Sequence, residues 1–309
     1  SGLTRAQMPQ LYEGNQICGT LSAEVAELTG LPRVPVVAGG GDNAAGAVGV
    51  GVTEPGQALI SLGTSGVIFS VSKQHHANPD NTVHAFCHCL PERWHQMSVA
   101  LSAANCLSWF AGLQQTSVTE LLDELEASNR NQTPIIFLPY LSGERTPHND
   151  PTASGCFFGL SNSSDRADMT LSILQGVAFA LADGLAALQS AGARFDSISL
   201  IGGGARSARW SQILADVLQQ PLHYRDGGEA GPGLGAARLA QLAIKQQQLT
   251  STQDEREHSN NAINTLIAKH CSPPKLLATY QPDPGRTAHY QTLLLRYRRL
   301  YQLTKKLNL

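Results

Sequence analysis

Short β-branched runs that end in glycine-rich turns are the feature of this sequence that most constrains its fold. One run, residues 34–38, passes through three glycines at 39–41 into a stretch of small residues that begins at Asp42. Another run, residues 198–201, passes through three glycines at 202–204 into a stretch with helical periodicity. β-branched runs indicate strands, and apolar residues spaced three and four apart indicate helices. The alternation of the two patterns predicts an α/β protein.

The other expected elements follow the same two patterns. Residues 57–71 indicate two strands folded about a turn at 63–66. Further strands are expected at 95–101, 135–138 and 222–224, and helices through Cys106 and Trp109 and at 168–190, 207–218, 234–244 and 289–307. Residues 245–286 are polar and rich in turn formers, so a surface connection or partial disorder is expected there. No starting element is evident in residues 1–33, and Ser1 is interpreted as a cut edge.

The charge balance and the cysteines narrow the class of protein. The formal net charge is −2, which provides no positive field for nucleic acid or an anionic membrane. A length of 309 residues favours one large domain plus part of another. The six cysteines lack a paired spacing, which indicates reduced thiols and a cytoplasmic protein. No uncharged apolar run reaches the roughly 20 residues that span a bilayer. We therefore expect neither nucleic acid nor a membrane as a partner.

A group of histidines and cysteines, His84, Cys87, His88, Cys89 and His95, has the composition of a metal site. In a strand, however, the two cysteines face one side while the first two histidines face the other. The spacing also lacks the C-x-x-C of structural zinc sites. We expect no metal site in this segment.

Asp42 is the first candidate functional residue. Aspartate is a preferred N-cap, and capping of the helix that begins here would by itself explain its presence. Three preceding glycines exceed what a cap requires, and they allow a ligand or another backbone to approach the helix end closely. An ionised carboxylate in such a place can orient a bound hydroxyl and accept its proton late in phosphoryl transfer.

Three other glycine-rich turns have both a structural and a functional interpretation. Residues 63–66, Gly-Thr-Ser-Gly, suit an ordinary hairpin tip, but their backbone N–H groups and two hydroxyls also suit a phosphate cradle. Residues 202–207, Gly-Gly-Gly-Ala-Arg-Ser, lack G-x-G-x-x-G and so disfavour a Rossmann cofactor, although small residues there could admit a base or ribose. Residues 231–235, Gly-Pro-Gly-Leu-Gly, are best explained by close helix packing.

Taken together and in order, these turns resemble the carbohydrate kinases of the FGGY family. The similarity lies in residues 39–49, 60–66, 138–148 and 200–207, and it extends from near residue 4 to at least residue 244. Within the family, residues 138–148, Leu-Pro-Tyr-Leu-Ser-Gly-Glu-Arg-Thr-Pro-His, are most similar to the bacterial xylulokinase subfamily. The resemblance implies an actin-like ATPase fold with a ribonuclease-H-like lobe, a mixed sheet flanked by helices, preceded by the tail of a similar lobe.

The resemblance also implies a site and its substrates. ATP with Mg²⁺ would phosphorylate a sugar hydroxyl, with D-xylulose giving D-xylulose 5-phosphate, and the protein could be a homodimer. Asp42 would be the catalytic base and Asn43 a further sugar contact. The matching cofactor-binding residues are Gly63, Thr64 and Ser65 for the phosphates, and Gly203, Gly204, Ala205, Ser207 and Gly143 for adenosine.

The sequence departs from the family in one respect. Family members open their first lobe with an Asp-x-Gly-Thr phosphate loop, and that motif does not occur in these 309 residues. We therefore expect residues 1–51 to be the end of the sugar-binding lobe and residues 52–309 to be the nucleotide-binding lobe, with little activity in this chain alone. Alternative substrates are ribulose, gluconate, fuculose and glycerol. A nucleotide-binding module of the same fold without catalysis is the alternative from another class.

Overall fold

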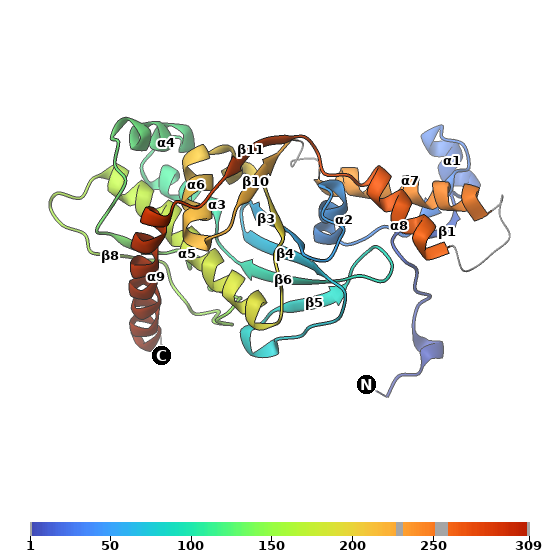
Figure 1. Ribbon diagram of the computed structural model, residues 1–309, viewed down its shortest axis with the longest axis horizontal. Helices are drawn as coiled ribbons and strands as arrows, with labels where there is room; N and C mark the ends of the chain where they lie inside the picture. The colour runs from blue at the N-terminus through green and yellow to red at the C-terminus, as the bar shows by residue number, and fades with distance from the viewer. Residues whose placement is uncertain (1, 227–230, 251–258, 308–309) are drawn as a thin grey trace. The chain divides into compact units, whose positions relative to one another are not determined.

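The computed structural model of the protein describes residues 2–226, 231–250 and 259–307 (Figure 1). The chain divides into two compact units, which are described separately. The first unit contains Ser1–Thr53, Cys87–Arg93 and Ala230–Pro274. The second unit contains Glu54–Phe86, Trp94–Glu229 and Lys275–Leu309.

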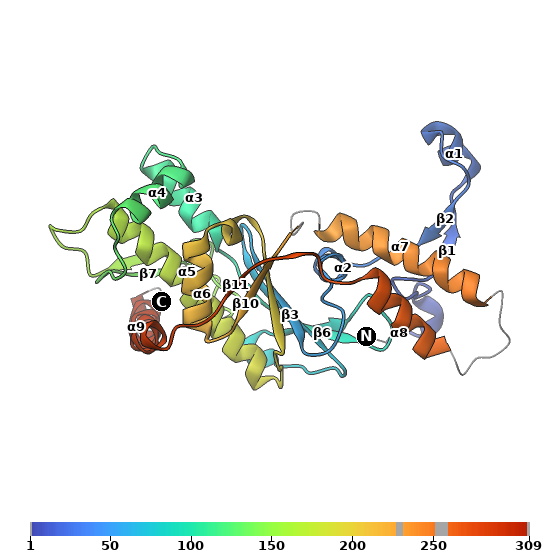
Figure 2. The same ribbon diagram turned by 45° about the horizontal axis from the view of Figure 1, so that its top comes forward.

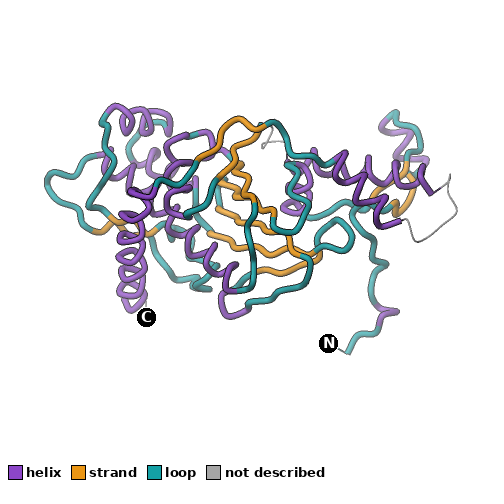
Figure 3. Tube along the Cα trace, in the orientation of Figure 1, coloured by secondary structure: helices purple, strands orange, loops and turns teal. Residues whose placement is uncertain are grey.

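The second unit is built on a mixed sheet of seven strands, drawn in orange in Figure 3. In spatial order these are β11 (Leu276–Tyr280), β10 (Leu222–Arg225), β9 (Ser197–Ile201), β3 (Gln57–Leu62), β4 (Gly66–Ser72), β6 (Trp94–Ala100) and β5 (His84–Cys87). Strands β3, β9 and β10 run parallel to one another, whereas β4 and β6 continue from β3 as an antiparallel meander. The C-terminal ends of β3 and β9 therefore lie side by side at one edge of the sheet.

The helices of the second unit bury an apolar core against this sheet. They are α3 (Ala104–Leu113), α4 (Val118–Ala127), α5 (Arg166–Ser190), α6 (Ala208–Leu218) and α9 (Pro284–Thr304), with short turns η2 (Pro79–Asn81), η3 (Gly203–Arg206) and η6 (Lys305–Leu307). A separate two-stranded sheet pairs β7 (Ile136–Leu138) with β8 (Cys156–Phe158). Helix α5 packs against β4, β6 and α6. It is long and apolar enough to cross a membrane, but 94% of its most apolar window is buried, as in the core helix of a folded domain.

The first unit is organised around a close helix pair, α2 (Asp42–Gly49) and α7 (Gly231–Thr250), visible side by side in Figures 1 and 2. A Cβ at Gly235 would stand 1.7 Å from the Ala45 carbonyl oxygen, and one at Gly49 would stand 1.9 Å from the Gly231 carbonyl oxygen. The two backbones are thus in direct contact. The remaining elements are η1 (Arg5–Gln7), β1 (Ile17–Thr20), α1 (Ala23–Thr29), β2 (Pro35–Val37), which pairs with β1, and α8 (Ser259–His270) against α7.

Most expected elements are present, but α4 and β8 were not expected, and two further regions differ from expectation. The hairpin at 57–71, the helix over 168–190 and the packing role of Gly231 and Gly235 are confirmed, whereas a Cβ at Gly233 would meet no atom within 4 Å. The prediction of a surface connection over 245–286 is wrong for α8 and β11, and residues 251–258 lie outside the described residues. Likewise, β1 and α1 occupy part of 1–33, where no element was evident. The lobe boundary between 51 and 52 stays a prediction.

Candidate nucleotide site

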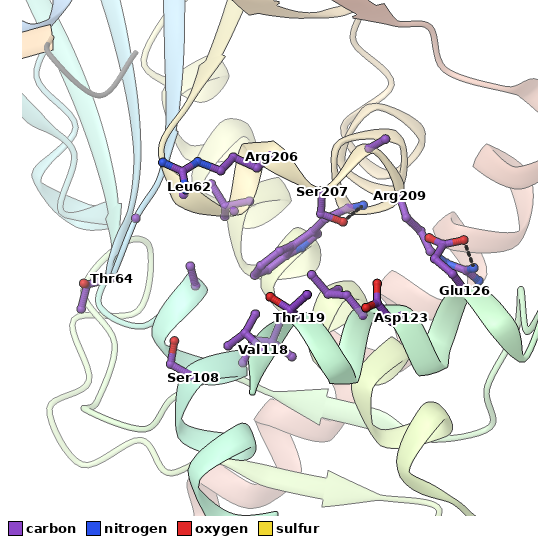
Figure 4. Close-up of a pocket in the computed structure, with 18 residues that line it drawn as sticks. Leu62, Thr64, Ser108, Val118, Thr119, Asp123, Glu126, Arg206, Ser207 and Arg209 are labelled. Carbon is purple, nitrogen blue, oxygen red and sulfur yellow. Dashed lines mark hydrogen bonds and ion pairs between the residues drawn. The ribbon is translucent and has the colours of Figure 1, made fainter. Parts of the chain in front are cut away.

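A pocket of about 720 Å³ lies within the second unit, where the ends of β3 and β9 meet α3, α4 and α6 (Figure 4). Its wall combines an apolar floor with hydroxyl and charged groups at the rim. The lining residues are Leu62, Gly63, Thr64, Ala104, Leu107, Ser108, Val118, Thr119, Leu122, Asp123, Glu126, Gly203, Gly204, Arg206, Ser207, Ala208, Arg209 and Trp210. A concave, mostly apolar pocket with a few polar groups is the usual form of a small-molecule site.

The turn between β3 and β4 forms one end of the pocket. It is the hairpin tip expected from the sequence, and it is fixed to the start of α3 by two hydrogen bonds. The Ala103 N–H donates to the Thr64 carbonyl oxygen at 2.9 Å, and the Ala104 N–H donates to the Gly63 carbonyl oxygen at 2.8 Å. The Thr64 side chain is exposed and that of Ser65 is half-buried. Fixed backbone with hydroxyls at an open edge suits the binding of a phosphate chain.

The loop after β9 forms a second wall, and its glycines have distinct causes. Gly202 has φ of 95°, and a Cβ there would stand 2.7 Å from Leu62 backbone atoms. A Cβ at Gly204 would stand 2.6 Å from the Leu62 side chain. At Gly203, by contrast, a Cβ would meet no atom within 4 Å. Gly202 and Gly204 let the loop after β9 approach Leu62 of β3. Gly203 instead leaves the pocket side of the loop open for a ligand.

Helix α6 begins immediately after this loop. The Ser207 hydroxyl oxygen accepts a hydrogen bond from the Trp210 N–H at 3.2 Å and so acts as its N-cap. The Trp210 indole N–H donates to the Leu174 carbonyl oxygen at 3.1 Å, which fixes the ring in the pocket floor. Ala205 is fully buried and does not line the pocket.

Two oppositely charged side chains, Glu126 and Arg209, lie at the end of the pocket away from the β3–β4 turn. In Figure 4, Glu126 and Arg209 lie on the opposite side of the view from Thr64. The Arg209 guanidinium donates to Glu126 at 3.3 Å, to Asn131 at 3.3 Å and to the Arg130 carbonyl oxygen. Its position is therefore fixed by three partners.

Asp42 and Asn43 lie in the first unit, at the start of α2. The N-cap of this helix is Gly41, and no side chain makes the capping hydrogen bond. One Asp42 carboxylate oxygen instead accepts hydrogen bonds from the backbone and side-chain N–H groups of Asn43, at 2.8 and 3.2 Å. The carboxylate is exposed. Capping by the Asp42 side chain thus does not account for its presence.

Gly143 is buried in the loop between β7 and β8 and is not among the pocket-lining residues of the described chain. It has φ of 72°, and a Cβ there would stand 2.8 Å from the Pro151 carbonyl oxygen. The next residue, Glu144, accepts hydrogen bonds from the N–H groups of Leu101 and Arg145 at 3.0 and 2.7 Å. Burial raises the pKa of the Glu144 carboxyl to about 7, against the opposing effect of these hydrogen bonds.

Within the described residues, no group of three or more His, Cys, Asp and Glu side chains lies close enough to hold a metal ion. In the segment with histidines and cysteines, His95 stacks on Phe69 with ring centroids 4.5 Å apart, and Cys89 is buried. Mg²⁺ commonly keeps several waters and binds through substrate phosphates. The hydroxyls at the β3–β4 turn therefore fit a hydrated ion that arrives with a nucleotide.

The comparisons with known proteins agree with this fold. Residues 58–244 match the FGGY family of carbohydrate kinases, C-terminal domain, and residues 1–49 match the N-terminal domain of the same family. The chain belongs to the FGGY family of carbohydrate kinases.

The relatives of this chain include several xylulose kinases. It is 50% identical over 301 residues to the xylulose kinase of Escherichia coli (strain K12). The aligned region covers 97% of this chain and 59% of that relative. The chain is 44% identical to the xylulose kinase of Klebsiella pneumoniae, over 99% of this chain and 60% of the relative. The chain thus spans about 60% of the length of these relatives.

Solved structures of similar proteins confirm the expected fold. A xyloylose kinase from Brucella ovis superposes with a TM-score of 0.86 at 40% identity, covering 99% of this chain and 60% of that one. The xylulose kinase from Rhodospirillum rubrum gives 0.79 at 26% identity, over 99% and 59%. The mixed sheet flanked by helices is the actin-like ATPase fold of these kinases.

Some pocket residues carry no signal in the sequence. Gly63, Thr64, Gly203, Gly204 and Ser207 were expected, and they meet at one pocket. The contributions of α3 and α4 were not expected, because their pocket-facing residues have the apolar and charged pattern of any amphipathic helix. Only the pairing of β3 with β9 and the packing of α4 against α3 and α5 bring these side chains together.

Proposed function

We propose that this chain is the nucleotide-binding part of a kinase that transfers the terminal phosphoryl group of ATP to a sugar hydroxyl. The observation that carries the proposal is the pocket with a hairpin tip, Gly63 and the hydroxyl-bearing Thr64, at one end and the open glycine Gly203 in its wall. The phosphates would bind at the tip, and adenosine would lie against the loop at 203–207. Phosphoryl transfer depends mainly on such positioning and on charge stabilisation.

Asp42 is the proposed catalytic base, and Asn43 holds its carboxylate. The exposed carboxylate has no capping role, and one oxygen is oriented by two N–H donors at 2.8 and 3.2 Å. The other oxygen would accept the proton of the attacking sugar hydroxyl as the new P–O bond forms. Mg²⁺, carried by the phosphates, would neutralise their charge during transfer.

The proposed sugar is D-xylulose, with D-xylulose 5-phosphate as the product. The names of the relatives at 50% and 44% identity support this choice over ribulose, gluconate, fuculose or glycerol. We propose further that the protein acts in the cytoplasm and forms a homodimer, and that the lobe boundary lies between residues 51 and 52. The alternative of a non-catalytic nucleotide-binding module predicts ATP binding without phosphoryl transfer.

The test is an assay of ADP release by a protein of the relatives' length that contains these 309 residues. D-Xylulose is expected to give the highest kcat/KM in a panel with D-ribulose, gluconate, fuculose and glycerol. The 309-residue chain alone is expected to bind ATP with little turnover. If the long protein bound ATP but released no ADP in response to any sugar, the kinase proposal would be rejected in favour of a non-catalytic nucleotide-binding module.

A second arm of the test concerns Asp42. Asp42→Ala in the long protein is expected to lower kcat by at least about a hundredfold while leaving the Kd for ATP within about threefold, because a general base commonly contributes 10²- to 10⁴-fold. Asp80→Asn, a change of an exposed carboxylate in η2, is the control. Turnover that survives the loss of Asp42 would remove its role as base.

A further inference from the structure

We infer that Asp123 on α4 recognises the exocyclic amino group of the nucleobase, so that the pocket selects ATP over a nucleoside triphosphate with an oxo group at that position. The inference rests on the proposed function and adds to it the residue that sets the choice of base.

The phosphate end of the pocket fixes that direction. The start of α3 is hydrogen-bonded to the β3–β4 turn through Ala104 and Gly63, at 2.8 Å. Ser108 lies one turn further along α3, about 6 Å from Ala104 by the rise of a helix. In Figure 4 the order across the pocket is Thr64, Ser108, then Thr119 and Asp123 of α4. A ribose that follows the phosphates would lie beside Ser108, and the base beside α4.

Helix α4 presents one acidic and apolar face to this end. Val118, Thr119, Leu122, Asp123 and Glu126 line the pocket, and their spacing places them along a single face of the helix. The two apolar side chains can cover the plane of a base. The carboxylates provide only hydrogen-bond acceptors. A base edge that faces them must therefore supply donors.

Of the two carboxylates, Asp123 is the one available to a ligand. Glu126 is already paired with Arg209, at 3.3 Å, and this guanidinium is fixed by Arg130 and Asn131 as well. Asp123 is exposed, and within the described part of the chain it has neither a hydrogen bond nor an ion pair. An unengaged acceptor at the rim loses no existing partner when a ligand donor arrives.

The chemistry of the base edge then decides which nucleotide binds. The amino group of adenine donates a hydrogen bond to the Asp123 carboxylate. The oxo group of hypoxanthine, at the same ring position in ITP, places a lone pair against the negative charge. Hydrogen bonds to charged groups are among the strongest that proteins make, and an unmatched one is costly. ATP and ITP have the same ribose and phosphates, and their bases differ only at this group and at the neighbouring N1, which carries a hydrogen in hypoxanthine.

Titration calorimetry on the 309-residue chain tests the inference through binding alone. The wild-type chain is expected to bind ITP at least about tenfold more weakly than ATP. Asp123→Asn is expected to reduce that ratio to within about threefold, because an amide can donate to an oxo group as well as accept from an amino group. Asp80→Asn makes the same chemical change outside the pocket and should retain the wild-type ratio.

The possible results distinguish a failure of the base selection from a failure of the nucleotide site. Equal binding of ATP and ITP by the wild-type chain, or an unchanged ratio in Asp123→Asn, overturns the inference while the nucleotide site stands. If Asp123→Asn instead weakens ATP and ITP by the same factor, and 2′-deoxy-ATP binds wild type as weakly, Asp123 holds the ribose and the inference is overturned. Binding of neither nucleotide by the wild-type chain overturns the proposed function together with the inference.

Discussion

Two neighbouring glycines after β9 lack side chains for opposite reasons, and this gives a test of the pocket at the residue scale. Gly203→Val places a side chain where no protein atom stands within 4 Å, so it should fill the nucleotide space without disturbing the core. ATP affinity measured by calorimetry is expected to fall by at least about tenfold, with the free energy of unfolding within about 0.5 kcal/mol of wild type.

Gly204→Ala is the matched control for that prediction. Its Cβ would stand 2.6 Å from the Leu62 side chain and 3.2 Å from the Trp210 ring, so the cost falls on stability, at about 1–3 kcal/mol by urea unfolding. Wild-type ATP affinity in Gly203→Val would show that the nucleotide does not approach this glycine.

Glu144 gives the chain a pH dependence with a definite sign. Burial raises the pKa of its carboxyl from 4.5 to about 7, so between these values the folded chain keeps a proton that the unfolded chain has lost. The free energy of unfolding should therefore fall as pH rises through this window, by about 3 kcal/mol at most. Glu144→Gln keeps an acceptor for the Leu101 N–H and removes the titration.

Urea unfolding at several pH values between 4.5 and 8 checks the prediction, with the variant compared to wild type at each. The comparison matters because burial lowers the pKa of His148 from 6.5 to about 4, and stability linked to that side chain is lost as pH falls through its own window. This contribution is common to both proteins and cancels in the difference. A difference that stays constant with pH would show that Glu144 is ionised throughout.

The backbone contact between α2 and α7 makes a prediction at the scale of elements. Gly235→Ala would place a Cβ 1.7 Å from the Ala45 carbonyl oxygen, which forces the two helices apart. The expected loss in the free energy of unfolding is about 3 kcal/mol, near the upper end of overpacking effects. Gly233→Ala, two residues earlier in α7, meets no atom within 4 Å and should raise stability by up to about 1 kcal/mol through helix propensity. Equal effects of the two changes would contradict the close contact.

Elements with long buried apolar patterns were predictable, whereas mostly exposed or polar elements such as β11 and α8 were not. The 168–190 periodicity predicted α5 because nearly every turn of that helix contributes to the core. Strand β11 escaped prediction because its side chains are mostly exposed, and it is formed by antiparallel pairing with β10 rather than by its own pattern. Helix α8 begins with Ser, Asn and Asn, and its helical state depends on packing against α7.

At the scale of the whole molecule, all residues of the pocket belong to the second unit. Hydrogen exchange on the 309-residue chain with saturating ATP is expected to slow in peptides over 61–66, 104–126 and 203–210, since a ligand stabilises the state it binds. Peptides from α2 and α7 of the first unit should exchange as without nucleotide. Protection centred on α7, with none over 203–210, would place the nucleotide elsewhere.

The residues of the site, like the elements of the fold, fall into those that could be predicted from the sequence and those that could not. Its glycines and hydroxyls could be predicted from short motifs, because a phosphate cradle requires those residue types next to one another in the chain. The role of Asp123 could not be predicted, because α4 is far along the chain from the loop after β9 that it faces across the pocket. Its relevance comes only from the packing of α3 and α4 beside the ends of β3 and β9.

The buried Trp210 also gives the protein an intrinsic optical signal. Its ring is 1% exposed and hydrogen-bonded to Leu174, yet it lines the pocket, whereas Trp94 and Trp109 lie outside the lining and Trp109 is 38% exposed. A soluble quencher will therefore reduce the fluorescence of Trp109 more strongly than that of Trp210. The emission that survives quenching comes from Trp210 and the half-buried Trp94, and only Trp210 lies in the pocket floor. A change in this emission when nucleotide is added therefore reports occupancy without a dye or a label.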